Sequence, residues 1–270
     1  FEKEMKEILS ALPSLERKVL TSATHKNKVP KFMNFKDAVC LDFLEAKSND
    51  LDLSLVLSPS NTLYTLLDLL KSLGDSRGII FFNLKNTLNR VSEFLSDEDV
   101  EHTWFYGGME QVDRERSLIQ FRNSSQRILL ATDLAARGID IPELDYIIHY
   151  EMPSREVEFI HRNGRTARMN ADGVALCIKG QDDQMPEYAK EIKTKEIQEG
   201  IGIPRNEWKT LFISGGRKDK ISKGDIVGLF MKKGNLNSNE LGVIELKNDC
   251  AFVAVSYDKA SIICQKLNNE

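Results

Sequence analysis

The alternation of short apolar runs with amphipathic stretches between residues 52 and 205 is the feature that most restricts the fold of this 270-residue chain. The runs are rich in β-branched and aromatic residues and have the length of strands. The stretches between them repeat their apolar residues at helical spacing. Such an order builds βαβ units, whose strands pair in parallel and whose helices cover both faces of the sheet. We therefore predict an α/β fold, with ligands at the carboxyl ends of the strands.

The same periodicity locates the individual elements. It predicts strands over 78–82, 101–105, 127–131, 146–150 and 173–178, and helices over 62–73, 87–95, 111–121 and 155–163. Towards the N-terminus it predicts a helix over 1–12 and strands over 18–21 and 38–43. The polar stretch Ser48–Asp52 is expected to be a linker.

A different order of elements follows Pro204. It consists of a strand over 210–214, a helix over 223–231, strands over 241–246 and 251–256 and a helix over 258–267. This β-α-β-β-α order is typical of a small ferredoxin-like or RNA-recognition-type α+β domain, which needs one further strand. We therefore expect three parts, 1–47, 48–205 and 206–270, the last of them without its final strand.

Charge is unevenly distributed along the chain. The net charge is −4 and the isoelectric point is near 5.8, which excludes a purely electrostatic nucleic-acid binder but allows a local basic site. Residues 206–270 carry a net charge of +2, against −6 for the rest. Their basic side chains cluster at Arg217, Lys218, Lys220, Lys223, Lys232 and Lys233. A basic loop that enters a helix suits an RNA contact, and a solvated basic face is the alternative.

Cysteine and histidine usage predicts no metal site. The four cysteines and four histidines lie far apart, without the paired spacing of zinc ligands or a dense disulfide framework. Reduced, buried thiols in a cytoplasmic protein are therefore the expectation. The sequence has no apolar run near the ~20 residues that a bilayer span requires, so no membrane partner is expected.

The polar loop after the apolar run RILLA is a candidate phosphate-binding loop. Backbone N–H groups at a helix start can hold an anion. Thr132 offers a hydroxyl and Arg137 a cation for a phosphodiester. Gly138 permits close approach of the backbone, and Asp140 can accept a hydrogen bond from a ribose hydroxyl. The alternative is an ordinary βα loop capped by Asp133.

Arg162, Arg165 and Arg168 recur at every third position of a segment that begins at His161 and contains Gly164. On a helix end broken by glycine, Arg165 and Arg168 can reach a common point. Arginine donates planar, bidentate hydrogen bonds to phosphate oxygens. An arginine on a transferring γ-phosphoryl group accelerates the transfer by roughly 10³–10⁵. A solvated basic helix face is the alternative, but it leaves the glycine and the histidine unexplained.

The segments ATDLAARGID and HRNGRTAR resemble motifs V and VI of the DEAD-box RNA helicases. Further segments follow the family's order: SAT at 22–24 resembles motif III, IIFFN at 79–83 resembles motif IV, and the glycine-plus-Q-x-x-R segment is matched by Gly107, Gly108, Gln111 and Arg114. Two departures are Leu84, where the family often has threonine, and Ala167, where glycine is common. The resemblance implies the end of a first RecA-like domain in 1–47 and a second RecA-like domain in 48–205.

The resemblance also implies a role for each matching residue. Arg165 and Arg168 would be arginine fingers that face the γ-phosphate of ATP, and Asp140 would contact the nucleotide ribose. His161 and Arg162 would couple the two RecA-like halves, as would Ser22 and Thr24. The RNA backbone would be held by Thr132, Arg137, Gly138, Gly107, Gly108, Gln111 and Arg114.

The sequence holds no G-x-x-x-x-G-K-[ST] phosphate loop and no DEAD sequence. In the family both precede motif III, and the ligands of the Mg²⁺ bound with ATP come mainly from that first domain. The chain is therefore expected to carry one half of a composite ATPase site. Alone, it is expected neither to hydrolyse ATP nor to unwind RNA.

The segments LFISGGRKDKISKGDIVGLF and LGVIELKNDCAFVAV resemble the C-terminal RNA-binding domain of the DbpA-type DEAD-box helicases. The resemblance implies a monomeric helicase that binds structured large-subunit ribosomal RNA in pre-ribosomal particles. Arg217, Lys218 and Lys220 are its candidate RNA contacts. A non-catalytic RNA-binding adaptor with the same fold is the second hypothesis. A nicotinamide-cofactor enzyme would need a G-x-G-x-x-G after a strand, which the chain lacks.

Overall fold

The computed structural model describes residues 2–21, 29–33, 39–41, 51–133, 141, 144–166, 173–198, 200 and 202–268. The chain divides into two compact units, residues 1–48 and residues 49–270. Six of the candidate site residues lie outside the described residues: Ser22, Thr24, Arg137, Gly138, Asp140 and Arg168.

The first unit contains helix α1 (Glu2–Ser10) and a 3₁₀ turn, η1 (Lys31–Met33). The strand predicted over 18–21 is wrong, because these residues are irregular and Val19 is 86% exposed. A strand needs a neighbouring strand with which to exchange hydrogen bonds, and the described residues of this unit supply none. In the strand predicted over 38–43, residues 39–41 are irregular and exposed, and the other three residues lie outside the described ones.

The second unit contains a six-stranded sheet with the order β1-β6-β5-β2-β4-β3, in which all neighbours pair in parallel. Its strands are β1 (Leu51–Leu57), β2 (Gly78–Phe82), β3 (Thr103–Phe105), β4 (Ile128–Thr132), β5 (Tyr146–His149) and β6 (Gly173–Lys179). The predicted α/β fold with a parallel sheet is confirmed. The linker prediction is wrong at its end, since Leu51 and Asp52 belong to β1. Asp52 pairs with Lys195 at 2.7 Å, so a strand at the end of the sheet order accommodates this polar residue.

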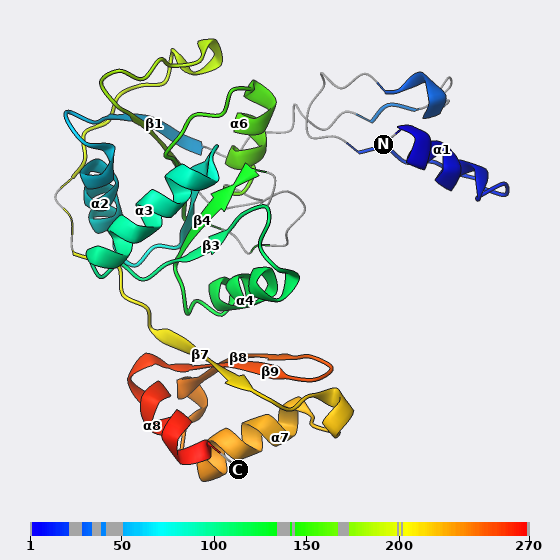
Figure 1. Ribbon diagram of the computed structural model, residues 1–270, viewed down its shortest axis with the longest axis vertical. Coiled ribbons are helices and arrows are strands. Elements are labelled where there is room, and N and C mark those ends of the chain that lie inside the picture. The colour runs from blue at the N-terminus through cyan, green and yellow to red at the C-terminus, as the bar shows by residue number, and fades with distance from the viewer. Residues whose placement is uncertain are drawn as a thin grey trace. The chain divides into compact units, whose positions relative to one another are not determined.

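Helices cover both faces of this sheet. Alternate residues of a strand point to opposite faces. Ile80 and Phe82 of β2 therefore join the core formed with α2 and α3, and Ile79 and Phe81 join the core formed with α4. Figure 1 shows α2 and α3 side by side on their face. The helices are α2 (Thr62–Leu73), α3 (Lys85–Asp97), α4 (Gln111–Arg122) and α6 (Glu156–Asn163).

Local signals fix the ends of α2 where the sequence predicts them. The side chain of Asn61 accepts a hydrogen bond from the backbone N–H of Leu63 at 3.0 Å and so caps the first turn. Gly74 follows the last turn with φ at 57°, a left-handed conformation that favours glycine. Because these signals act within a few residues, they can be read without knowledge of the tertiary structure.

His149, at the end of β5, is fully buried. Its burial predicts that the stability of the chain depends on pH. Its Nε2 lies 2.9 Å from Oδ1 of Asn163, and its ring packs 4.7 Å from that of Phe159, measured between centroids. Burial and then the positive charge of Arg162 lower the pKa of His149 from 6.5 to about 3. The unfolded chain binds a proton here below pH 6.5, whereas the folded chain does not until about pH 3.

The stabilisation from neutral His149 is therefore complete above pH 6.5 and is lost as the pH falls towards 3. We expect the free energy of unfolding to lose up to about 1.4 kcal/mol per pH unit within this window through His149. Urea denaturation of the chain and of His149→Gln over a series of pH values measures this. The substituted chain should show a shallower pH slope, and equal slopes in the two proteins would contradict the assignment.

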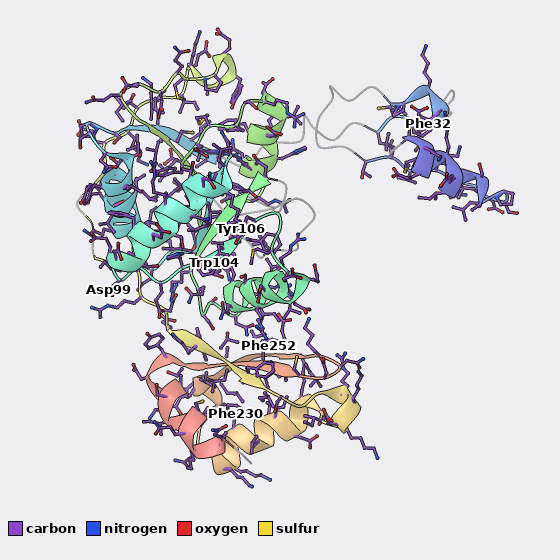
Figure 2. The ribbon with its side chains drawn as sticks, viewed as in Figure 1. Phe32, Asp99, Trp104, Tyr106, Phe230 and Phe252 are labelled. Atoms are coloured by element: carbon purple, nitrogen blue, oxygen red, sulfur yellow. The ribbon has the colours of Figure 1, made fainter. Side chains whose placement is uncertain are left out.

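The second, smaller sheet of this unit is antiparallel, with the order β7-β9-β8. Its elements are β7 (Trp208–Ile213), α7 (Lys223–Gly228), the π-helical turn η4 (Leu229–Lys233), β8 (Leu241–Leu246), β9 (Ala251–Ser256) and α8 (Tyr257–Leu267). The predicted β-α-β-β-α order is confirmed. Both helices pack on one face of the sheet, with Phe230 in the core between them (Figure 2). We call residues 208–268 the appended domain.

Among the helices that the structure describes, none combines the length and the hydropathy that crossing a bilayer demands.

Candidate functional site

The loops at the carboxyl edge of the parallel sheet converge on one buried arginine, Arg162 of α6. Its side chain is 1% exposed. Nε and Nη2 donate to the carboxylate of Asp133 at 2.7 and 2.6 Å, and Nη2 also donates to Oδ1 of Asn83 at 2.7 Å. Nη1 donates to the backbone carbonyl of Glu151 at 2.7 Å, and the guanidinium lies 5.1 Å from the centre of the Phe81 ring. One side chain therefore ties together the ends of β2, β4 and β5.

The resemblance assigns Arg162 to coupling between two RecA-like halves, and this role stays a prediction. In the structure the guanidinium of Arg162 is enclosed and paired with Asp133 of its own domain. A buried arginine with all its partners in place holds loops rigidly rather than binding a ligand. Arg162 is a positioning residue, which fixes the end of α6 against the sheet.

The carboxylate of Glu151 anchors the start of α3. It accepts hydrogen bonds from the backbone N–H groups of Asn83 and Leu84 at 2.7 and 3.2 Å and from the hydroxyl of Thr87 at 2.8 Å. Charge-assisted hydrogen bonds of this kind are among the stronger ones in proteins. The polar residues Asn83, Asp133 and Glu151 were missed as a group by the sequence analysis. The available signal is that each follows an apolar strand within two residues.

His161 and Arg165 lie at the end of α6. His161 is exposed in the last turn, and Gly164 caps the helix. The next residue, Arg165, is half-buried, and its backbone N–H donates to the carbonyl of Arg162 at 3.0 Å. This hydrogen bond fixes the backbone of Arg165 relative to Arg162, whose own side chain is held by the hydrogen bonds described above. We call Arg162 locked in this sense. Arg168, expected to act beside it, lies outside the described residues.

A glycine turn follows β3 on the same edge of the sheet. Gly107 and Gly108 are exposed, and Gly108 has φ at 90°, a left-handed conformation that disfavours other residues. A Cβ on Gly108 would meet nothing within 4 Å, so its backbone conformation alone requires glycine. Tyr106 precedes the turn, near the end of β3 (Figure 2), and the ammonium of Lys85 lies 4.4 Å from its ring centre. This turn therefore presents backbone groups to solvent beside a cation.

Gln111 and Arg114 lie in the first turns of α4, directly after this glycine turn. Gln111 is exposed. Arg114 is half-buried, its guanidinium carbon lies 4.9 Å from the centre of the Phe105 ring, and its Nε has no hydrogen-bond partner among the described residues. Thr132 differs, because it is only 9% exposed at the end of β4. The structure thus brings the glycine turn, Gln111 and Arg114 together at the surface, with Thr132 below it.

The basic loop of the appended domain is held by its backbone and exposes its side chains. Arg217, Lys218 and Lys220 are all exposed. The N–H of Arg217 donates to the carbonyl of Lys247 at 3.0 Å, and that of Lys218 to the carbonyl of Asn248 at 2.8 Å. These bonds tie the loop to the β8–β9 turn, so three cationic side chains project from a fixed backbone.

A Cβ on Gly216, just before this loop, would lie 2.6 Å from backbone atoms of Asn248 and Asp249. Only glycine fits at that contact without moving the backbone. Gly216 therefore allows the basic loop to lie against the β8–β9 turn.

Two known domain families match the two parts of the second unit. Residues 61–170 match the helicase conserved C-terminal domain. Residues 210–270 match the DbpA RNA binding domain. The first match contains the glycine turn, Arg162 and Arg165, and the second contains the basic loop.

Two curated relatives are ATP-dependent RNA helicases, and one of them aligns along the whole of this chain. The ATP-dependent RNA helicase DbpA of Escherichia coli strain K12 is 31% identical over 185 residues, which cover 66% of this chain and 40% of that protein. The ATP-dependent RNA helicase DbpA of Bacillus subtilis strain 168 is 24% identical over 311 aligned positions, which cover 100% of this chain and 64% of that protein. The chain therefore spans less than two thirds of the length of these relatives.

Among solved structures, the DEAD-box protein SrmB of Escherichia coli aligns with 54% of this chain and 90% of its own, at 25% identity and a TM-score of 0.50. This likeness agrees with a RecA-like sheet with helices on both faces.

Proposed function

Because the chain belongs to the DEAD-box family of RNA helicases and carries a DbpA RNA-binding domain, we propose that it works as part of an ATP-dependent helicase for structured ribosomal RNA, during assembly of the large ribosomal subunit. The observation that carries the ATPase part of this proposal is the locked Arg162. It fixes the end of α6 and so sets the position from which Arg165 acts.

ATP is the cofactor of this proposal, and the donor set at the end of α6 suits its phosphates. A guanidinium at Arg165 and an exposed imidazole at His161 offer N–H donors to anionic oxygens. Arg165 and Arg168 would contact the γ-phosphate, and Asp140 the ribose. A Mg²⁺ ion would be held mainly by the other RecA-like half, which also contributes the phosphate loop. Ser22 and Thr24 would help to couple the halves.

The RNA backbone would lie along the edge of the sheet formed by the glycine turn and the loop after β4. The exposed amides of Gly107 and Gly108, with Gln111 and Arg114, supply donors that suit phosphate and ribose oxygens and read no base. Thr132, Arg137 and Gly138 would continue this track. Recognition through phosphates and 2′-hydroxyl groups explains how one enzyme can act on RNA of varied sequence.

The composite nature of the ATPase site provides the test of the proposed activity. The 270-residue chain alone should release no phosphate from ATP, with or without RNA, because it lacks a phosphate loop. The full-length protein should release phosphate at a rate that RNA increases. Release by the short chain would contradict the split site, and an inactive full-length protein that still binds RNA would favour the adaptor hypothesis. Gel filtration and cell fractionation would test the proposed monomeric state and cytoplasmic location.

The basic loop predicts how RNA affinity depends on salt. The double substitution Lys218→Glu with Lys220→Glu should weaken binding to ribosomal RNA hairpins, because it removes two exposed cations from the fixed loop. For every phosphate that the variant no longer neutralises, the slope of log affinity against log salt should fall by roughly 0.7–0.9. Lys266→Glu, at an exposed position of α8, is the control for charge reversal elsewhere in the domain. An unchanged salt slope in the double variant would remove these lysines from the RNA interface.

A further inference from the structure

The chain after β6 packs against α6 and then runs along the edge of the parallel sheet. We call residues 185–195 the strap. The backbone N–H of Leu55 in β1 donates to the carbonyl of Lys193 at 2.8 Å, and the N–H of Lys195 donates to the carbonyl of Leu55 at 2.8 Å. Between these two bonds, Thr194 pairs with β1 in parallel. Because β1 ends the strand order of the sheet, these bonds cover its open edge and fix the backbone of the strap.

The part of the strap that meets α6 carries Tyr188, in the 3₁₀ turn η2 (Glu187–Ala189). The ring of Tyr188 packs against that of Phe159 in α6, with the centroids 5.3 Å apart and an interplanar angle of 42°. Its hydroxyl donates to the backbone carbonyl of Pro153, in the loop that leads into α6. Burial raises the pKa of Tyr188 to about 12, so this hydroxyl stays protonated and able to donate at neutral pH. Tyr188 therefore contacts both α6 and the loop before it.

Helix α6 depends on contacts of this kind because it has only 8 residues. Such a short helix is not stable by itself, so packing against its neighbours determines where it lies. The side chain of Arg155, at the N-cap position, makes no capping hydrogen bond with the first turn that the structure describes. The hydroxyl of Tyr188 instead fixes the chain two residues earlier, at Pro153.

A row of rings continues from Tyr188 towards the buried arginine. Phe159 lies 4.7 Å from the ring of His149, which in turn lies 6.3 Å from that of Phe81, measured between centroids. The guanidinium of Arg162 lies 5.1 Å from the centre of the Phe81 ring. Phe159 and Arg162 are three positions apart and so lie on the same side of α6. The helix is thus held at Arg162 by the loops of the sheet and at Phe159 by the strap.

We propose that Tyr188 is a positioning residue for ATP hydrolysis, because it holds α6 from the strap and so sets the place from which Arg165 acts on the γ-phosphate. The proposal rests on the ATPase function proposed above. Arg165 comes directly after Gly164, which ends α6, so a shift of the helix also shifts its backbone. A displacement of about 1 Å in a catalytic group can lower the rate about 10²-fold. Tyr188 lies beyond residues 61–170, so the matched helicase domain does not mark it.

The test measures RNA-stimulated ATP turnover by the full-length protein and its Tyr188 variants. Tyr188→Ala removes both the ring and the hydroxyl and should lower kcat by roughly tenfold to a hundredfold. Tyr188→Phe keeps the ring contact with Phe159 and should lose only part of kcat. Equilibrium binding of a fluorescent ATP analogue and of RNA should stay unchanged, because Tyr188 acts through α6 and touches neither ligand. A thermal melt gives the folded fraction at the assay temperature, to which kcat is normalised.

Two comparisons separate positioning from a general effect on folding. Tyr64→Ala breaks an aromatic pair with the same 5.3 Å spacing, between α2 and α3, and should leave turnover unchanged. The second comparison repeats Tyr188→Ala in an Arg165→Lys background. An ammonium has no planar fork that needs to be aimed, so the loss of kcat should be much smaller there. A general effect on folding would lower kcat by the same factor in both backgrounds.

The proposal is overturned if Tyr188→Ala turns over ATP as the unsubstituted protein does. It is also overturned if the substitution lowers kcat equally with arginine and with lysine at position 165. An unsubstituted full-length protein that hydrolyses no ATP would overturn the proposed function first, and the role of Tyr188 with it. The unsubstituted protein therefore distinguishes failure of the proposed function from failure of the positioning role.

Discussion

Replacing Arg165 with alanine in the full-length protein should lower RNA-stimulated ATP turnover by about 10³-fold or more. The residue lies directly after the glycine that ends α6, and its backbone is bonded to the locked Arg162. A guanidinium placed on the γ-phosphate stabilises charge that develops only in the transition state, so its loss should affect turnover rather than binding. Phosphate release under saturating ATP and RNA measures turnover, and equilibrium binding of a fluorescent ATP analogue measures nucleotide affinity.

Two further variants make this result specific. Arg165→Lys keeps a positive charge without the planar, bidentate donors and should recover only part of the activity. Arg155→Ala removes an arginine that is 70% exposed at the start of the same helix, and it should leave turnover unchanged. A thermal melt should show that Arg165→Ala remains folded. Wild-type turnover in a folded Arg165→Ala protein would rule out the finger assignment.

Replacing Arg162 with alanine should destabilise the chain by about 3 to 5 kcal/mol, the usual cost of removing one partner of a buried ion pair. The substitution leaves the carboxylate of Asp133, the amide oxygen of Asn83 and the carbonyl of Glu151 without their donor. It also removes the guanidinium from the face of the Phe81 ring. A loss of this many kcal/mol is a large part of the free energy of unfolding of an ordinary domain. Urea denaturation followed by circular dichroism gives the change in the free energy of unfolding.

The control for Arg162→Ala is again Arg155→Ala. Arg155 pairs with Glu158 at the surface, where water screens the interaction, so its loss should leave the unfolding curve almost unmoved. Arg162→Lys should fall between the two, because an ammonium cannot bond both oxygens of Asp133 and also reach Asn83. An Arg162→Ala chain as stable as the unsubstituted one would show that the loops do not depend on this side chain.

Much of the fold could be predicted from the sequence because its signals act locally. Apolar periodicity predicts β2, β5 and α4 at or near their observed bounds, and the Asn61 cap and Gly74 mark the ends of α2. The start of β1 instead resembles a linker in the sequence, because Asp52 is polar and the three residues 48–50 before Leu51 are Ser, Asn and Asp. Its strand character depends on β6, more than a hundred residues away, which provides its hydrogen bonds.

The sequence by itself determined the parallel sheet, the appended domain and the set of arginines that begins in the last turn of α6, because spacing and residue type are properties of short segments. From residue type and spacing alone it could not show that the side chain of Arg162 is enclosed whereas that of Arg165 is half-buried. That difference comes only from the tertiary structure. Asn83, Asp133 and Glu151 come from three separate loops, and they meet at Arg162 because the order of the strands brings β2, β4 and β5 together.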